Sequence, residues 1–292
     1  MSVFGMLVMD SITIYIMKKQ TSIKQLRATG SVAISCPPEA SAGIVRASTW
    51  WEAFCALPKQ TRLEFPYQEG SGYELQETPG ATRDLKEHFH FTEGKADWLA
   101  DTAIQTGEVA VMQFVQNTVA LLPLIRPLVL EFAREVEKFY GLEGFVDEVA
   151  SGEGKWIIRF LHYFGGRIAG DEIATAHTDK SGFTLNFTST SGLERLDYDG
   201  VWRPMPVAEG QTTINTSMQL QYRSKGELKA LCHRVVATPA TAVNGRFSMV
   251  CFIPLTKTAS YNKKGAGRLQ EFAPGFNYTM PFEEFGKLFV KE

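Results

Sequence analysis

Apolar positions recur at helical spacing in two segments of the first half of the chain. The shorter segment, residues 46–58, stops at Pro58, a residue that a helix interior does not accommodate. The longer segment covers residues 96–141, and its last part has an apolar residue every three or four positions before Gly141. This pattern predicts a helical layer that covers another part of the fold. The polar, glycine-containing stretch at residues 59–83 is expected to be a loop.

Short runs rich in β-branched and aromatic residues follow from residue 155 onward, separated by glycine, asparagine, aspartate and proline. They read KWIIRFLHYF, GFTLNF, LERLDYDGVWRPM, QTTINTS, CHRVVATP and RFSMVCFIPL. Helices followed by many short strands predict an α+β protein with a double-stranded β-helix, or jelly-roll, core and a helical layer. We expect residues 1–150 to be a helical and mixed region packed on a core of residues 151–292 that includes a C-terminal tail. The two regions are expected to form one compact unit.

The composition argues against two classes of partner. The chain has 292 residues, with 30 basic and 32 acidic side chains and a net charge of −2, so it lacks the basic surplus typical of proteins that bind nucleic acid or anionic membranes. Its 4 cysteines are widely spaced and form no C-x-x-C pair. This usage is typical of reduced thiols in a cytoplasmic protein. The sequence does not indicate an oligomeric state.

Two apolar blocks resemble membrane segments at first sight. The N-terminal block is interrupted by Asp10, and the block at residues 118–132 carries Pro123, Arg126 and Pro127. Both fall short of the roughly 18 uninterrupted apolar residues that a spanning helix needs. We therefore expect no membrane span, a strand near residues 12–16, and a dispensable stretch of about ten residues before it.

His177 and Asp179 stand two apart in the strand-like run ATAHTDKSGFTLNF. Alternate residues of a strand share a face, so both side chains can reach one metal ion. The pair alone is a weak signal, since a satisfied histidine and a turn aspartate give the same spacing. His233, in the strand-like run ALCHRVVATP, supplies a third ligand. Two imidazoles and one carboxylate form the facial triad of non-haem Fe(II) oxygenases, although zinc accepts the same ligand types.

Arg246 and Ser248 are also two apart on a predicted strand, in NGRFSMVCFIPL. A guanidinium and a hydroxyl on one face can bind a carboxylate. A buried arginine requires an anion, because an unpaired guanidinium in a barrel costs several kcal/mol. The competing interpretation of this pair, taken alone, is an arginine at the rim with a core-facing serine.

Taken together, these residues resemble a known family. H-T-D at residues 177–179, YDGVWRPMP at 198–206, QLQYRSKGELKALCHRVV at 219–236 and R-F-S at 246–248 are similar to the isopenicillin N synthase-like group of Fe(II)/2-oxoglutarate-dependent dioxygenases. The likeness runs from about Trp156 to Leu255 and extends to the segment at residues 72–91. Such a set of motifs in one order is highly specific.

The resemblance implies an enzyme that uses Fe(II), 2-oxoglutarate and O2. It implies that His177, Asp179 and His233 bind the metal, and that the 2-oxoglutarate carboxylate meets the residues Arg246, Ser248 and Tyr163. The implied reaction is hydroxylation, desaturation or cyclisation at a C–H bond of a small-molecule metabolite, of the kind found in secondary metabolism, with release of succinate and CO2. Halogenation is disfavoured, because the family's halogenases lack the carboxylate ligand.

Two alternatives remain open at the level of the sequence. A same-fold Fe(II) oxidase such as isopenicillin N synthase uses no 2-oxoglutarate, and its arginine and serine serve the carboxylate of the substrate instead. A jelly-roll binding protein without catalytic activity is the second alternative. The R-x-S spacing does not separate the first of these from the dioxygenase.

Several further residues lie near the predicted metal site in the sequence pattern or resemble metal ligands. The residues proposed to touch the substrate are Arg159, Lys180, Phe183 and Phe252, each with ordinary packing as the competing interpretation. His88 and His90 are interpreted as structural, because no acidic partner is evident in a matching strand. His162 is expected to point away from the site, since it neighbours Tyr163 on one strand.

The chain departs from the usual family pattern at three places. Leu161 replaces an asparagine, residues 164–166 replace the prolines after the tyrosine, and residues 217–218 replace a Gly-Asp pair. The stretch between His233 and Arg246 is also longer than in plant members. None of these differences is expected to touch a proposed ligand, but the first two predict a differently shaped co-substrate site.

Overall fold

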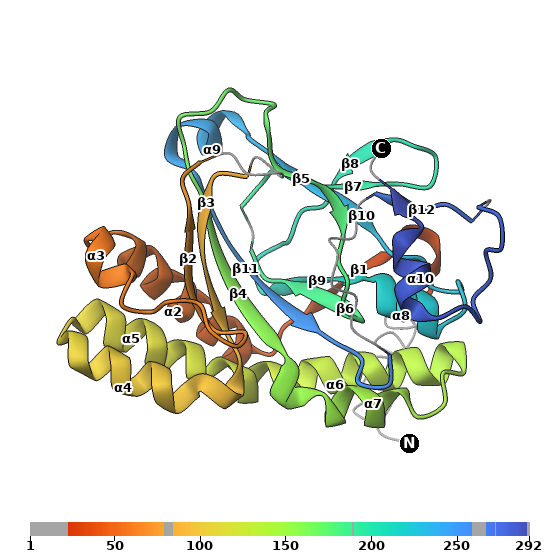
Figure 1. The fold of residues 1–292 in the computed structure, drawn as a ribbon, viewed down its shortest axis with the longest axis horizontal. Coiled ribbons are helices and arrows are strands. Elements are labelled where there is room, and N and C mark those ends of the chain that lie inside the picture. The colour runs from red at the N-terminus through yellow and green to blue at the C-terminus, as the bar shows by residue number, and fades with distance from the viewer. Residues whose placement is uncertain (1–22, 79–83, 189, 259–266, 272, 291–292) are drawn as a thin grey trace, which may run out of the picture.

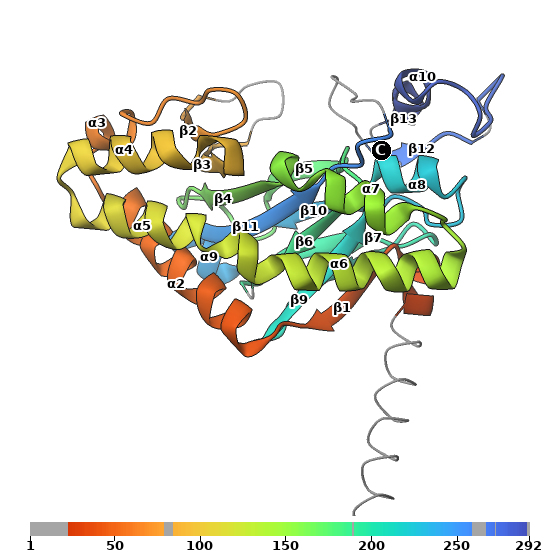
Figure 2. The same cartoon turned by 90° about the horizontal axis from the view of Figure 1, so that it is seen from below.

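The structure, a computed structural model, describes residues 23–78, 84–188, 190–258, 267–271 and 273–290. Two antiparallel sheets face each other, and helices cover the outer face of the larger sheet (Figures 1 and 2). The predicted α+β class with a jelly-roll core is therefore confirmed. The strand expected at residues 12–16 lies outside the described residues.

The larger sheet has seven strands in the order β1-β9-β6-β11-β4-β3-β2, and the smaller has four in the order β5-β10-β7-β8. The strands of the larger sheet are β1 Ser31–Ser35, β2 Gly72–Gln76, β3 Lys86–Phe91, β4 Ile157–Tyr163, β6 Phe183–Asn186, β9 Gln211–Thr216 and β11 Arg246–Ile253. Those of the smaller sheet are β5 Glu172–Thr178, β7 Leu193–Leu196, β8 Trp202–Pro204 and β10 Cys232–Val236. A third sheet pairs β12 Arg268–Leu269 with β13 Phe289–Val290. Because β1, β2 and β3 pair into the larger sheet, residues before 150 contribute directly to the barrel, and the division at residue 150 stays a prediction.

The helices largely follow the predicted pattern. They are α2 Pro38–Cys55, α3 Lys59–Arg62, α4 Ala96–Thr106, α5 Val109–Val119, α6 Leu121–Tyr140, α7 Phe145–Ser151, α8 Met218–Arg223, α9 Pro239–Asn244 and α10 Phe282–Lys287. Helix α2 begins earlier than the apolar spacing indicated, because Pro38 stands in its first turn, where a missing N–H costs nothing. Helix α6 ends at Gly141, which adopts the left-handed conformation with φ 64°. At the other end of the chain, α10 packs on α8 through Tyr222, Phe282 and Phe285.

An aromatic core joins the helical layer to the back of the larger sheet. Phe114 of α5 lies at the centre, with ring centroids 5.1 Å from Phe54, 5.0 Å from Phe89 and 5.0 Å from Phe160. The indole N–H of Trp51 in α2 donates to the carbonyl of Leu161 at 3.3 Å. The inner strand β4 is thus fixed from behind by α2 and α5, which lie in the segments where the apolar spacing predicted helices.

The expected loop at residues 59–83 is wrong in part, since it contains α3 and β2. Strand β2 pairs with β3 in an antiparallel register that sets Glu74 opposite His88. The strand was missed because only Tyr73 of its five residues is a buried large side chain, so period-two alternation is barely visible.

One long apolar stretch is present within the described residues. Val109–Tyr140 is long and apolar enough to cross a membrane by length and composition alone, with 39% of its most apolar window buried. The prolines and the arginine therefore do not exclude this block by length and composition, contrary to expectation, because Pro127 lies inside α6 without breaking it. Core helices of soluble proteins pass the same test, so the finding carries no further conclusion.

A buried carboxylate ties the back of the larger sheet together. Glu87 of β3 is 1% exposed and accepts hydrogen bonds from Arg62, Tyr73 and His162. His162 also stacks on Phe247 with centroids 4.0 Å apart. The prediction that His162 points away from the site is confirmed. Burial alone would raise the pKa of Glu87, but the hydrogen bonds from His162 and Tyr73 and the charge of Arg62 hold the pKa below its ordinary value.

Replacing Glu87 with glutamine is expected to lower the free energy of unfolding by about 2–3 kcal/mol at pH 7, because it leaves Arg62 without its counter-charge. A carboxyl group whose pKa is lowered by folding stabilises the folded state at pH values above its unfolded pKa of about 4.3. This contribution to the free energy of unfolding is lost as the pH falls through the folded pKa. Urea unfolding should therefore show a gap between wild type and Glu87→Gln that narrows below about pH 4. The exposed helix variant Glu52→Gln is the control, expected within about 0.5 kcal/mol of wild type. An equal gap at about pH 7 and about pH 3.5 would contradict this account.

Candidate active site

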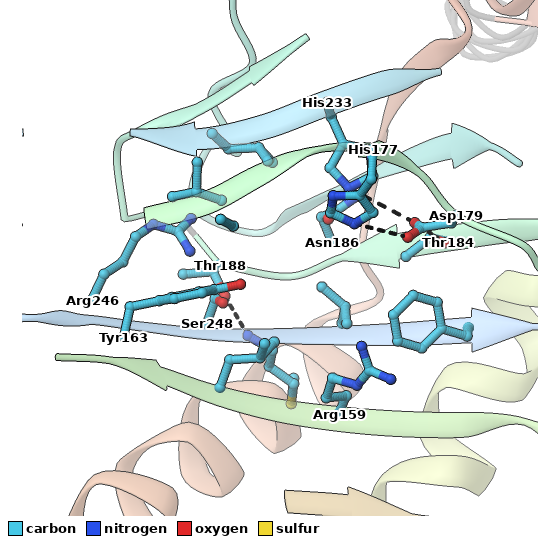
Figure 3. A pocket seen from close by; sticks show the side chains of 17 residues that line it. Arg159, Tyr163, His177, Asp179, Thr184, Asn186, Thr188, His233, Arg246 and Ser248 are labelled. Atoms are coloured by element: carbon cyan, nitrogen blue, oxygen red, sulfur yellow. Dashed lines mark hydrogen bonds and ion pairs between the residues drawn. The ribbon is translucent and has the colours of Figure 1, made fainter. Parts of the chain in front are cut away.

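A cavity lies between the two sheets, and its floor is built by alternate residues of β4 and β11. The side chains of Arg159, Leu161 and Tyr163 come from β4, and those of Arg246 and Ser248 come from β11 (Figure 3). Because alternate residues share a face, the aromatic residue between them, Phe160, points into the core behind the sheet. The other lining residues are Ala174, His177, Asp179, Thr184, Asn186, Thr188, Leu193, His233, Val235, Met249, Val250 and Phe252.

The structure brings His177, Asp179 and His233 together at one end of this cavity (Figure 3). His177 of β5 and His233 of β10 are direct cross-strand partners, with ring centroids 4.5 Å apart. Asp179 follows the last residue of β5. Its carboxylate oxygens lie 3.5 Å from His177 Nε2 and 3.9 Å from His233 Nε2. One ligand atom from each residue lies within 4.8 Å of the others, which is a spacing that one metal ion can bridge.

Backbone carbonyls orient both imidazoles toward the carboxylate. His177 Nδ1 donates to the carbonyl of Thr175 at 2.6 Å, and His233 Nδ1 faces the carbonyl of Leu231 at 3.4 Å. Because Nδ1 of each ring faces a carbonyl, Nε2 is the nitrogen that faces Asp179 and would bind a metal ion through its lone pair. Histidine ligands to metals are commonly held in this way. The donor set and its orientation fit Fe(II).

The charges of the three groups depend on one another. Burial opposes ionisation of Asp179, but the charges of His233 and His177 hold its pKa well below the ordinary value. Burial lowers the pKa of His233. For His177 burial acts in the same direction, yet the hydrogen bond and charge of Asp179 raise the pKa above its ordinary value. The carboxylate is thus ionised and available as a ligand at neutral pH.

Thr184 supports the carboxylate, and the sequence analysis missed it. Its hydroxyl donates to Asp179 Oδ2 at 2.6 Å. The backbone N–H of Met218 donates to the Asp179 carbonyl at 2.9 Å. The replaced Gly-Asp pair at residues 217–218 therefore does contact the backbone of a proposed ligand residue, contrary to expectation.

Replacing Thr184 with valine removes this hydrogen bond at nearly constant volume, and we expect roughly tenfold weaker Fe(II) affinity. Competition with a coloured Fe(II) chelator under anaerobic conditions measures the change. Thr213→Val is the matched control, because Thr213 is a buried threonine whose hydroxyl has no hydrogen-bond partner among the described residues. Equal Fe(II) affinities of Thr184→Val and Thr213→Val would show that Thr184 does not hold the Asp179 carboxylate in place.

The residues predicted to bind the 2-oxoglutarate carboxylate lie at the other end of the cavity. Arg246 is 2% exposed and lies directly across from Tyr163 in the β4–β11 pairing, with Ser248 beside it (Figure 3). Its guanidinium donates to the carbonyls of Ser191 at 3.0 Å and Thr190 at 3.1 Å. No carboxylate of the described residues forms an ion pair with it. Burial accordingly lowers the pKa of Arg246. A buried cation with a free face fits the carboxylate of 2-oxoglutarate.

The four proposed substrate residues divide into two groups. Arg159 and Phe252 line the cavity, as expected. Phe183 does not: it is 0% exposed and packs on Phe132 with centroids 4.8 Å apart, so this prediction is wrong. Lys180 follows Asp179 in the turn after β5 and is not among the residues that line the cavity. The wrong placement of Phe183 and the omission of Thr184 have one cause. Neighbouring residues of a strand point to opposite faces, so the wrong face for Phe183 also directs Thr184 away from the site.

The replaced prolines lie at the arginine end. Gly165 passes so close to the end of α9 that a Cβ atom there would lie 2.2 Å from the Val243 carbonyl oxygen. Gly245, which precedes Arg246, has φ 80°, and a Cβ atom there would lie 2.7 Å from the Tyr163 carbonyl oxygen. Helix α9 lies in the stretch between His233 and Arg246, which the resemblance led us to expect to be longer than in plant members. The predicted difference in shape thus arises from a contact that only glycine permits.

A second histidine pair lies beside the cavity floor. His88 and His90 share the face of Arg159, since His90 and Arg159 are cross-strand partners. Glu74 of β2 bonds His88 Nε2 at 2.8 Å. The statement that no acidic partner accompanies these histidines is wrong, because β2 was taken for a loop.

Comparison with known proteins agrees with this geometry. A sequence model of the 2OG-Fe(II) oxygenase superfamily matches residues 158–254. A solved structure of a 2OG-Fe(II) oxygenase family protein from Caulobacter crescentus is similar, with TM-score 0.70, 24% identity and coverage of 91% of each chain. A full-length Neurospora crassa protein, solved in complex with alpha-KG and 5-formyluracil, gives TM-score 0.68, 20% identity and coverage of 85% of this chain and 81% of that one.

A plant structure gives a similar result. The dioxygenase for auxin oxidation 1 from Arabidopsis thaliana, as its 2-oxoglutarate complex, gives TM-score 0.66 and 18% identity, covering 81% of this chain and 87% of that one. At these identities the solved structures establish the shared fold.

Proposed function

Because residues 158–254 belong to the 2OG-Fe(II) oxygenase superfamily, we propose that this 2-oxoglutarate-dependent dioxygenase hydroxylates, desaturates or cyclises a small-molecule metabolite at a C–H bond. The products expected from the co-substrate are succinate and CO2. The intact carboxylate ligand Asp179 favours these outcomes over halogenation.

One observation carries the proposal. A potential facial triad and a buried guanidinium without a carboxylate partner among the described residues face the same cavity from its two ends. A stable fold rarely retains an unpaired buried cation without a ligand that neutralises it. A five-carbon diacid that reaches from the triad toward Arg246 supplies that charge.

The protein side of the mechanism follows from the residues present. Fe(II) together with 2-oxoglutarate and O2 supplies the oxidising chemistry when bound. His177, Asp179 and His233 would hold the metal. Arg246, Ser248 and Tyr163 would orient the co-substrate through its distant carboxylate. The apolar side chains of Leu161, Leu193 and Val235 line the cavity between them and exclude water.

The neighbouring structures suggest where to begin with substrates. The Neurospora crassa protein has been crystallised with thymine, and the Arabidopsis protein is a dioxygenase for auxin oxidation. Incubation of the purified chain with Fe(II), 2-oxoglutarate and a panel of nucleobases, aryl carboxylic acids and phenolics tests the proposal. We expect at least one compound to raise succinate release severalfold above the uncoupled rate. The absence of any 2-oxoglutarate turnover in an iron-loaded, folded preparation would reject the proposed function.

A further inference from the structure

We propose that Arg159 binds a carboxylate group of the primary substrate, so that the substrate class is an organic acid. The inference rests on the proposed function and adds a recognition group to it. It concerns the end of the cavity floor that lies opposite Arg246.

The position of Arg159 separates it from the co-substrate group. Arg159 pairs with Val250, and Tyr163 pairs with Arg246, in the same β4–β11 ladder. The two guanidinium-bearing residues are thus four positions apart along the floor, which corresponds to about 13 Å. Figure 3 shows Arg159 below the metal-ligand group and Arg246 at the far side of Tyr163 and Ser248. One small ligand with a single carboxylate does not occupy both guanidinium groups.

Neighbouring residues hold the Arg159 side chain over the floor. Its Nε–H donates to His90 Nε2, and its guanidinium carbon lies 4.6 Å from the centroid of the Phe252 ring. Burial together with the charge of Arg159 lowers the pKa of His90, so this imidazole is a neutral acceptor at neutral pH. The Nε atom is therefore engaged, whereas none of the hydrogen bonds found among the described residues involves the two terminal nitrogens.

The charge of Arg159 has no close counter-charge among the described residues. No carboxylate there lies within 4.0 Å of it, and it forms no ion pair. The carboxylates that act on it from a greater distance are Asp179 and Glu74. The hydroxyls of Tyr163 and Tyr67 act in the same direction. Asp179 is a proposed metal ligand, so a bound divalent cation would offset its charge. Glu74 is paired with His88 and its side chain is 47% exposed to solvent.

The basic side chains near Arg159 are already paired or neutral, so Arg159 is the group there that lacks a close counter-charge. Lys86 lies at the Tyr163 end of the same face and pairs with Asp84 at 3.2 Å. His88 and His90 are neutral or nearly so, since burial lowers both pKa values. An incoming carboxylate would meet the free edge of the Arg159 guanidinium in the paired geometry that this group favours. An amide or ester of the same acid lacks the charge and the second acceptor oxygen.

The experiment observes the two arginines separately. Protein labelled with 15N, loaded with Zn(II) and saturated with 2-oxoglutarate, is titrated with phenylacetate and, in parallel, with the neutral analogue phenylacetamide. The Nε–H signals of the two residues are identified by their loss in Arg159→Lys and Arg246→Lys. We expect phenylacetate to shift the Arg159 signal and to bind at least about tenfold more tightly than phenylacetamide. In Arg159→Gln the preference should fall below about threefold.

The outcomes are distinguishable from failure of the proposed function. A shift of the Arg246 signal on addition of 2-oxoglutarate tests the co-substrate site, whatever happens at Arg159. If Arg246 responds but phenylacetate shifts the Arg159 signal no more than phenylacetamide does, the inference is overturned. Retention of the carboxylate preference in Arg159→Gln overturns it as well. Arg234→Gln is the control, because Arg234 pairs with Glu194 and stacks on Trp202, and the preference should remain there.

Discussion

Replacing Asp179 with alanine is expected to reduce succinate formation below about 1% of the wild-type rate and to weaken Fe(II) binding by more than about 100-fold. The loss exceeds the roughly 10- to 100-fold effects typical of residues that only support a ligand, because a direct ligand is removed. The two imidazoles that remain keep their contacts with the backbone carbonyls but lose the neighbouring carboxylate. Chelator competition and succinate assays, both after anaerobic loading, measure the two effects.

Asp101→Ala is the matched control for this substitution. Asp101 lies exposed on α4, and its removal should leave both measurements within about twofold of wild type. Circular dichroism establishes whether Asp179→Ala retains the fold without metal. A folded Asp179→Ala protein that still binds Fe(II) with wild-type affinity would exclude the three-residue metal site.

Replacing Arg246 with leucine is expected to raise the KM for 2-oxoglutarate by roughly 100-fold or more. Two charge-assisted hydrogen bonds to a carboxylate contribute on the order of 3 kcal/mol together at the lower end of their usual range, and about 1.4 kcal/mol corresponds to a factor of ten. Arg246→Lys keeps the positive charge but loses the two parallel hydrogen bonds of a guanidinium. Its KM for 2-oxoglutarate should therefore lie between those of wild type and Arg246→Leu. Fe(II) affinity without 2-oxoglutarate should remain close to wild type.

Arg203→Gln removes an exposed arginine that pairs with Asp199 at the surface, and it should leave the KM for 2-oxoglutarate unchanged. An unchanged KM in Arg246→Leu would mean that the co-substrate is anchored elsewhere. That result would revive the alternative in which the arginine and serine bind the substrate of an oxidase.

The sequence predicted the residues whose chemistry is unusual better than the residues that support them. His177, Asp179 and His233 could be named because few side chains bind iron and their order is specific. Thr184 could not, because a threonine on a strand is ordinary until its face is known. Phe183 was placed in the site although β6 alternates apolar and polar residues. The cavity lies on the polar face, which carries Thr184 and Asn186, and Phe183 lies on the opposite, core face.

The fold shows the same division. The long amphipathic helices and the β-rich second half were predictable, because their patterns extend over many residues. Strand β2 was not predictable in this way, so its residue Glu74 was not identified as the acidic partner of His88. Its place in the sheet depends on pairing with β3, a contact between segments that no local pattern contains.

The close contact at Gly165 limits how this protein can be redesigned from its relatives. Consensus engineering would restore a proline after Tyr163 at this position, where the family usually carries one. Every residue except glycine would drive its first side-chain carbon into the Val243 carbonyl, 2.2 Å from that position, and displace the turn that leads into Arg246. A side chain at this position is therefore incompatible with the fold unless the helix between β10 and β11 is exchanged in the same step.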